Sequence, residues 1–153
     1  MVFDHDVHIG VISEPRSVEV EKGFLKFFAR ATGETDPVYF DEDAARAAGH
    51  PGLPAPPTYL FSLALSVPAK RGDIFDLIYG MGLDRRCILH GEQNFTYHRA
   101  IYAGDRLTLT STTSDIYTKK SGALVFIAQD TQALNDSGQL CIEMRVLTVV
   151  RRV

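Results

Sequence analysis

Three long segments in the second half of the chain alternate polar and apolar residues and are joined by short turns. They cover residues 106–118, 123–133 and 139–150 and are rich in valine, isoleucine, leucine and threonine. Alternation with a period of two is typical of β-strands with one buried face. Because tight turns join only antiparallel neighbours, these segments predict an antiparallel meander, and residues 94–98 predict a further strand before it.

The first half of the chain has helical periodicity instead. Apolar residues recur at three- and four-residue spacing, which predicts a helix from about Val18 to Thr32 with Ser17 as its cap. Gly33 follows, in the position where a left-handed residue often ends a helix. The buried stripe of this helix is expected to comprise Val20, Phe24, Phe27, Phe28 and Ala31.

Two further helices are expected before the strands begin. Asp41 can cap a short alanine-rich helix over residues 42–48 that Gly49 closes. After a proline-rich loop, Pro57 stands where a first helical turn tolerates proline. The following residues, 58 to about 69, are apolar nearly all round, which is typical of a helix buried on most sides.

One buried helix and a long antiparallel sheet indicate an α+β protein whose sheet wraps the helix. This arrangement is the hot-dog fold. An open sheet of this kind would leave an edge strand unpaired, and pairing two subunits edge to edge would cover it. We therefore expect a homodimer or a heterodimer with a second chain of the same fold.

Size, charge and cysteines narrow the class of protein. The chain has 153 residues and a net charge of −3, which indicates one domain over residues 1–153 and no phosphate-tracking nucleic-acid surface. The longest apolar run is too short to span a membrane, and the N-terminus lacks a signal-peptide pattern, so a cytoplasmic protein is expected. Cys87 and Cys141 lack metal-ligand spacing and are expected to be reduced and buried, with no metal bound.

Three stretches of the chain resemble one family. Residues 28–45 contain Thr-Gly-Glu-Thr-Asp-Pro-Val-Tyr-Phe, residues 52–58 read Gly-Leu-Pro-Ala-Pro-Pro-Thr, and residues 90–105 include His-Gly-Glu-Gln-Asn-Phe and Tyr-Ala-Gly-Asp. In this order they resemble the MaoC-like hydratases and dehydratases, also called (R)-specific enoyl-CoA hydratases. The resemblance extends from about Ile9 to Arg151.

The resemblance implies an acyl thioester, carried by CoA or acyl carrier protein, and no cofactor. In the active members an Asp and a His hold the water that adds to or leaves the acyl chain; this sequence has Glu34 and Tyr39 at those positions. A backbone N–H at the start of the central helix polarises the thioester carbonyl, but Pro56 and Pro57 have no N–H to offer. The chain therefore resembles the N-terminal half of FAS1-like dehydratases and the noncatalytic subunits of (3R)-hydroxyacyl-ACP dehydratases.

The candidate catalytic residues are Glu34, Tyr39 and His90. Glu34 could supply a carboxylate displaced by one methylene, whereas a tyrosine, with an ordinary pKa of about 10, is a poor substitute for a histidine. Tyr39 is therefore expected to be a packed aromatic that lines the pocket. Asp36 precedes a proline and is interpreted first as a turn residue, with substrate binding as the alternative.

His90 and Glu92 stand two apart on an expected strand, so their side chains would share one face and could pair. The alternative is a structural hydrogen bond at the end of the sheet or at a dimer contact. His98 would lie on the same face and complete a polar ladder. Glu92 is kept as a candidate for substrate binding, together with the residues that begin the central helix: Pro57, Thr58 and Tyr59.

Three functions remain open. The first is a subunit of an acyl-thioester hydratase or dehydratase that binds substrate while a partner chain supplies Asp and His. The second is a self-sufficient homodimeric enoyl-CoA hydratase that uses Glu34 with Tyr39 or His90. The third is a binding module for acyl-CoA without catalysis, and a hot-dog thioesterase is a more distant alternative.

Overall fold

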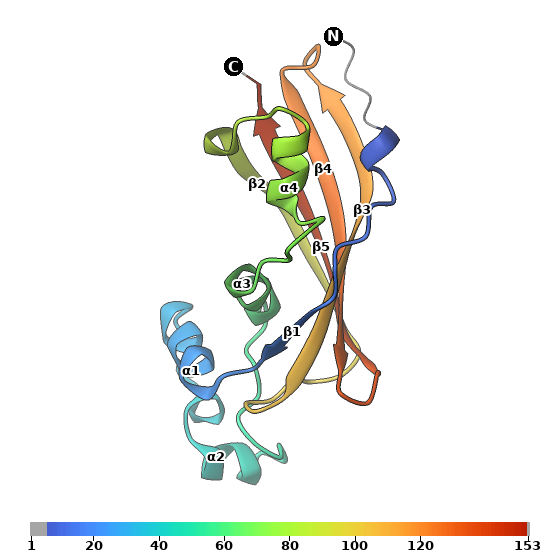
Figure 1. The fold of residues 1–153 in the computed structure, drawn as a ribbon. Coiled ribbons are helices and arrows are strands. Elements are labelled where there is room, and N and C mark those ends of the chain that lie inside the picture. Colours follow the sequence, from blue (N-terminus) through green and yellow to red (C-terminus); the bar gives the residue numbers. More distant parts are fainter. Residues whose placement is uncertain (1–5, 153) are drawn as a thin grey trace.

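The structure is a computed structural model that describes residues 6–152. Its sheet has five antiparallel strands in the order β1-β3-β4-β5-β2 (Figure 1). The long strands β3, β4 and β5 are neighbours, so the predicted meander is confirmed. The strand bounds are β1 Arg16–Glu19, β2 Ile88–Tyr97, β3 Arg106–Lys119, β4 Leu124–Asn135 and β5 Leu140–Arg151.

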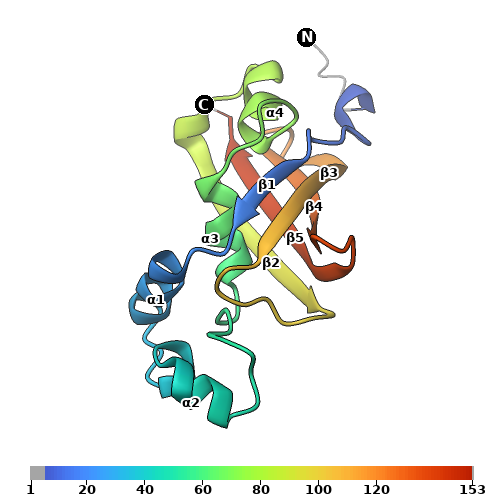
Figure 2. The ribbon, with the colours of Figure 1, turned by 60° about the horizontal axis from the view of Figure 1, so that its bottom comes forward.

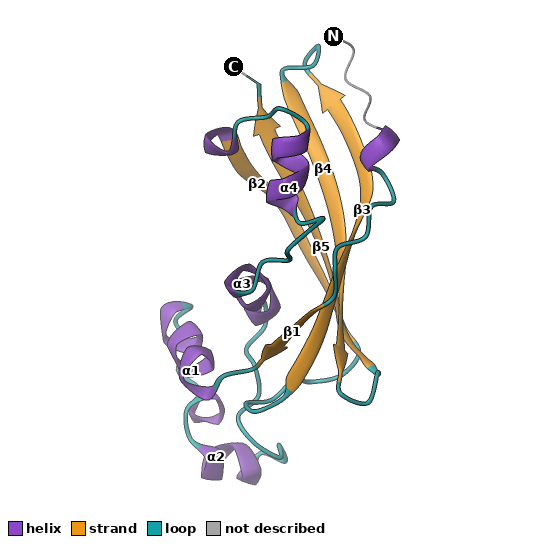
Figure 3. Ribbon diagram, in the orientation of Figure 1, coloured by secondary structure: helices purple, strands orange, loops and turns teal. Residues whose placement is uncertain are grey.

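Four α-helices lie on one side of the curved sheet, and α3 packs against its concave face (Figures 1 and 3). The turned view of Figure 2 shows α1 and α2 beyond one end of α3, while α4 covers the other end of the sheet. None of the helices among residues 6–152 is long and apolar enough to cross a membrane. The bounds are α1 Lys22–Ala31, α2 Glu42–Ala47, α3 Tyr59–Ser66 and α4 Ile74–Gly80, with 3₁₀ turns η1 Asp6–His8, η2 Pro37–Tyr39 and η3 Arg85–Cys87.

The start of the first helix differs from the prediction. Residues 16–19 form the edge strand β1, which pairs with β3, and Ser17 caps nothing. The helix begins at Lys22, where the carboxylate of Glu21 accepts a hydrogen bond from the N–H of Phe24 at 2.7 Å. Val18 and Val20 are both buried, at the two-residue spacing of a strand. This short alternation directly precedes the helical pattern, so the prediction assigned both to one helix that starts at Val18.

The later start also changes which face of α1 is buried. Leu25 and Ala29 are fully buried, whereas Phe27, placed in the buried stripe by the prediction, is 64% exposed. Ala31 is exposed as well. The helix end agrees with the prediction, because Gly33 adopts a φ of +81° just beyond it.

The central helix is shorter than expected and a fourth helix follows it. α3 ends at Ser66 instead of about residue 69. Asp73 then caps α4, which was not predicted, by accepting a hydrogen bond from the N–H of Asp76 at 2.8 Å. Leu77 and Ile78 of this helix belong to a second core cluster at that end of the sheet.

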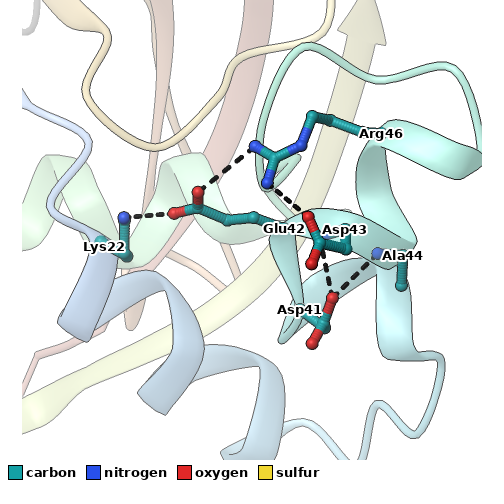
Figure 4. A network of polar contacts seen from close by, with 6 residues as sticks. All are labelled: Lys22, Asp41, Glu42, Asp43, Ala44 and Arg46. Atoms are coloured by element: carbon teal, nitrogen blue, oxygen red, sulfur yellow. Dashed lines mark hydrogen bonds and ion pairs between the residues drawn. The ribbon is translucent and has the colours of Figure 1, made fainter.

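The helix predicted over residues 42–48 is confirmed as α2, with Asp41 as its cap. The Asp41 carboxylate accepts hydrogen bonds from the N–H groups of Asp43 and Ala44 (Figure 4). Glu42 forms ion pairs with Lys22 and Arg46 and so connects α2 to the first turn of α1. These groups are largely exposed, so the ion pairs add little to the stability of the protein.

Candidate functional site

A groove of about 250 Å³ lies between α3, the start of α4 and the concave face of the sheet. On α3, the groove-lining residues Phe61, Ala64 and Leu65 recur at the three- and four-residue spacing of a single helix face, and Pro68 lines the groove just beyond the end of the helix. On β5, alternate residues of the concave face line the opposite wall: Met144, Val146 and Thr148. This mainly apolar lining suits a hydrocarbon chain.

Polar groups stand at two places in this apolar groove. The ring of His90 packs edge-on against Phe61, with ring centroids 5.0 Å apart. Elsewhere, Arg16 of β1 donates a hydrogen bond from Nη2 to Ser111 Oγ at 3.3 Å. Burial lowers the pKa of Arg16 from its ordinary value, and the negative charge of Asp73 acts in the opposite direction.

A pairing of His90 with Glu92, one of the two interpretations of these residues, is not present in the structure. The register of β2 against β5 shifts between these two residues, because Gly91 forms a β-bulge. His90 lies opposite Thr148 and faces the groove, whereas Glu92 lies opposite Leu147 on the other face of the sheet. An extra residue in the strand reverses the alternation, so Glu92 is separated from the groove by the sheet itself.

His98 does not extend a ladder from His90 either. Its Nε2 lies 2.8 Å from a carboxylate oxygen of Glu143, which pairs with Thr96 in the neighbouring strand. Thr96 and Glu143 are on the face opposite His90, because the bulge at Gly91 separates the two parts of β2. The polar groups predicted to form one row therefore lie on two faces.

Glu34, Asp36 and Tyr39 lie together beyond the end of α1, outside the groove lining. Asp36 caps the turn η2 by accepting a hydrogen bond from the N–H of Val38 at 3.0 Å, in agreement with its interpretation as a turn residue. Tyr39 is half-buried. Its pKa is raised by burial first and then by the negative charges of Glu34 and Asp36, so its hydroxyl stays protonated near neutral pH.

The start of α3 has an unusual geometry. Thr58 adopts a left-handed φ of +68°, which a β-branched residue rarely does. Its N–H donates a hydrogen bond to the hydroxyl of Tyr97 on the edge strand β2 at 3.0 Å. Pro57 and Thr58 are both exposed. The N–H that could replace those missing from Pro56 and Pro57 is thus already occupied by a side chain of the same protein.

Tyr59 lies in the core of the molecule, although it was expected to contact substrate. Only 1% of the residue is exposed, and its ring packs on Phe24 and Phe28 at centroid distances of 5.7 and 5.3 Å. Burial, with a smaller contribution from the charge of Glu21, raises the pKa of Tyr59 to about 12. Its hydroxyl has no hydrogen-bond partner among the described residues.

Arg16 and Tyr97 are among the residues of the site that were not predicted. Arg16 was hidden because its segment was assigned to a loop before a helix, although the alternation through Val18 and Val20 could have revealed the strand. Tyr97 was assigned to a strand, but its contact with Thr58 joins residues far apart in sequence and leaves no local signal. Among residues 6–152, no cluster of His, Cys, Asp and Glu is arranged to hold a metal ion.

Comparison with known proteins gives a consistent result. The family model described as "FAS1-like, dehydratase domain region" matches residues 7–144. A UPF0336 protein of Streptomyces griseus is 36% identical over 133 residues, which cover 87% of this chain and 85% of that protein. A UPF0336 protein of Parafrankia is 35% identical over 125 residues, which cover 82% of this chain and 79% of that protein.

Solved structures of similar shape include two complexes from Mycobacterium tuberculosis. A chain of the C-terminally truncated HadBC (3R-hydroxyacyl-ACP dehydratase) complex matches with a TM-score of 0.76 at 25% identity. The match covers 92% of the present chain and 96% of the HadBC chain. A chain of the ChsH1-ChsH2 complex has a TM-score of 0.73 at 25% identity, with coverages of 92% and 89%.

A MaoC-like dehydratase from Rhodospirillum rubrum matches with a TM-score of 0.69 at 22% identity. The match covers 100% of the present chain and 99% of the Rhodospirillum chain. Together with the HadBC chain it confirms the predicted hot-dog fold.

Proposed function

Since the chain belongs to the FAS1-like dehydratase domain family, we propose that it is the substrate-holding subunit of an acyl-thioester hydratase or dehydratase. The reaction removes water from a 3-hydroxyacyl thioester to give the trans-2-enoyl thioester, or adds it back. The acyl chain lies in the groove beside α3. A second MaoC-like chain supplies the Asp and the His that act on the substrate.

The observation that carries this proposal is the hydrogen bond from the Thr58 N–H to the Tyr97 hydroxyl. Stabilising the enolate oxygen of the reacting thioester needs a donor that is free and aimed at that oxygen. Pro56 and Pro57 have no N–H, and the donor of Thr58 is already used. The start of α3 in this chain is therefore poorly suited to polarise a carbonyl, and the donor is expected on the partner chain.

The positions of Glu34 and Tyr39 support the same division of labour. Neither lines the groove in which the acyl chain would lie. The raised pKa of Tyr39 makes its hydroxyl a weak acid and its phenolate scarce near neutral pH. His90 does face the groove, but its surroundings there are the apolar ring of Phe61 and the wall of β5.

The partner is proposed to be a homologous chain because the similar chains from Mycobacterium tuberculosis belong to the HadBC and ChsH1-ChsH2 complexes. In the present chain β2 is the outer strand of the sheet, next to β5 only. Leu89 and Tyr97 on this strand are 54% and 52% exposed. An open strand with exposed apolar side chains is a suitable edge for pairing with a second sheet.

The test is a hydration assay on a medium-chain trans-2-enoyl-CoA with this chain alone, a MaoC-like partner that carries Asp and His alone, and the mixture. We expect the mixture to exceed this chain alone by at least about 100-fold, because one missing acid–base group costs roughly 10²–10⁴ in rate. Glu34→Gln in the mixture is expected to leave the rate unchanged.

Two outcomes would contradict the proposal in different ways. Activity of the chain alone that Glu34→Gln abolishes would instead identify a self-sufficient homodimeric hydratase. Tight binding of acyl-CoA without turnover in any mixture, tested with each available MaoC-like partner, would identify a binding module. Asp36→Asn serves as a matched control, because it changes a neighbouring carboxylate whose role is to cap η2.

A further inference from the structure

The groove contains a positively charged group, Arg16, that forms no ion pair with any described residue. The Arg16 guanidinium is half-buried and makes one hydrogen bond, to Ser111. Its Nε has no hydrogen-bond partner, and none of the ion pairs between described residues includes Arg16. Because a half-buried charge is costly unless its donors are used, this arrangement indicates a ligand with an acceptor atom.

The floor of the groove around Arg16 is polar as well. Ser111 Oγ lies 2.8 Å from Thr131 Oγ1, and both residues are buried on the concave face of the sheet. Gln129, two residues from Thr131 along β4, lines the groove as well. A groove that held only hydrocarbon would gain from apolar residues at these positions. The lining thus has an apolar wall on the helices and a polar patch on the sheet.

Arg16 lies near the loop that follows α3, whereas Thr58 precedes that helix. The segment before β1 runs beside the loop that follows α3, because the N–H of Glu14 donates to the carbonyl of Arg71 at 3.2 Å. Asp73, in the same loop, is close enough to raise the pKa of Arg16 through its negative charge. A thioester placed at the N-terminal end of α3 would therefore direct the distal part of its acyl chain toward Arg16.

The charge of Asp73 limits the chemistry of that distal group. Its carboxylate lines the groove and caps α4, and it partly balances the charge of Arg16. A second carboxylate would be repelled by Asp73, whereas a neutral oxygen could accept hydrogen bonds from the guanidinium without repulsion.

We infer that the groove selects acyl thioesters that carry a ketone or hydroxyl oxygen in the distal part of the chain, and that Arg16 donates hydrogen bonds to this oxygen. The inference rests on the proposed function, because it takes the groove as the acyl site. It adds that substrates with an oxygenated chain are preferred to saturated chains of equal length.

Calorimetric titration of the purified chain tests this with three pantetheine thioesters, because pantetheine is common to CoA and acyl carrier protein. One carries a medium-length saturated acyl chain, one the same chain with a distal ketone, and one the same chain ending in a carboxylate. We expect the ketone to bind at least about tenfold more tightly than the saturated chain. Arg16→Met should remove this difference, so that the ketone and the saturated chain bind equally.

Arg86→Met is the matched control, because its side chain is 85% exposed and pairs with Asp84 outside the groove. The inference is wrong if the wild-type chain shows no preference, if it prefers the carboxylate, or if Arg16→Met keeps the preference. If Arg16→Met does not fold, Arg16→Lys takes its place as the test. Lysine lacks the planar guanidinium, so it should reduce the preference for the ketone. An unchanged preference in Arg16→Lys would contradict the inference. Failure of all three thioesters to bind would reject the proposed function too, whereas equal binding of the ketone and the saturated chain would reject this inference and leave the proposed function intact.

Discussion

At the scale of single residues, Tyr59 shows how a polar atom can be carried in a core without a partner. Its ring fills space between Phe24 and Phe28, while its hydroxyl is buried and unpaired. A buried group of this kind loses its hydrogen bonds to water and gains none in return. We therefore predict that Tyr59→Phe leaves the free energy of unfolding unchanged or raises it by up to about 1 kcal/mol. Urea denaturation measures this.

The pH dependence of the same residue gives a second readout in that experiment. The folded pKa of about 12 lies above the ordinary value of 10.0, so the stability linked to this group is complete below pH 10 and is lost as the pH rises toward 12. Wild-type protein should lose more stability over this range than Tyr59→Phe. Tyr79→Phe is the control, because Tyr79 is 87% exposed. A clear loss of stability in Tyr59→Phe at neutral pH would show that the hydroxyl has a partner.

Residues that act on their own backbone neighbours could be predicted from the sequence. The cap at Asp41, the turn at Asp36 and the left-handed glycine after α1 all follow from chemistry within a few positions. Contacts such as Thr58 with Tyr97 could not be predicted, because they depend on how distant elements meet. This is why the candidate site was predicted less well than the local structure.

At the scale of elements, the bulge at Gly91 decides which face of β2 each side chain occupies. A Cβ added to Gly91 would lie 2.8 Å from the carbonyl oxygen of Leu147 and 3.0 Å from a methyl group of Val149. The first neighbour is backbone and cannot move cheaply. We predict that Gly91→Ala lowers the free energy of unfolding by about 1–3 kcal/mol, as measured by chemical denaturation.

Gly52→Ala is the matched control for that substitution. No atom lies within 4 Å of a Cβ at Gly52, and its φ is not in the left-handed region, so stability should change by less than about 0.5 kcal/mol. Equal stabilities of the two variants would mean that the bulge has room for a side chain.

The strands of the meander were predicted to within a few residues because their alternation is long and their turns are well marked. The prediction assigned β1 and α1 to a single helix, because the four residues of β1 are too few to distinguish a period of two from one of 3.6. α4 was missed because seven residues give a weak periodic signal. The bulge was not predicted, although a single glycine inside a strand, here Gly91, is a known signal for one.

At the scale of the whole molecule, the open edge at β2 is where we expect the second chain to bind. We predict that Leu89→Lys raises the dissociation constant of the dimer at least about tenfold, because a lysine on an edge strand opposes pairing with another sheet. Sedimentation of this chain, alone and with its MaoC-like partner, measures the effect.

Phe27→Lys provides the comparison for the edge variant. Phe27 is also an exposed apolar residue, at 64%, but it lies on α1, away from β2. It should leave assembly unaffected. Dissociation caused by both variants, or by Phe27→Lys alone, would place the contact on the helical side of the molecule.

The strand order also predicts the order in which the strands join the sheet during folding. The hairpins that join β3 to β4 and β4 to β5 close over a few residues, whereas β1 and β2 pair with strands that are far from them in the sequence. Short loops cost less entropy to close than long ones, so the middle of the sheet can nucleate on its own and the two flanking strands join it later. The open edge at β2, where the second chain is expected to bind, would then form last. Partly folded chains would therefore lack this edge until the middle of the sheet is already buried.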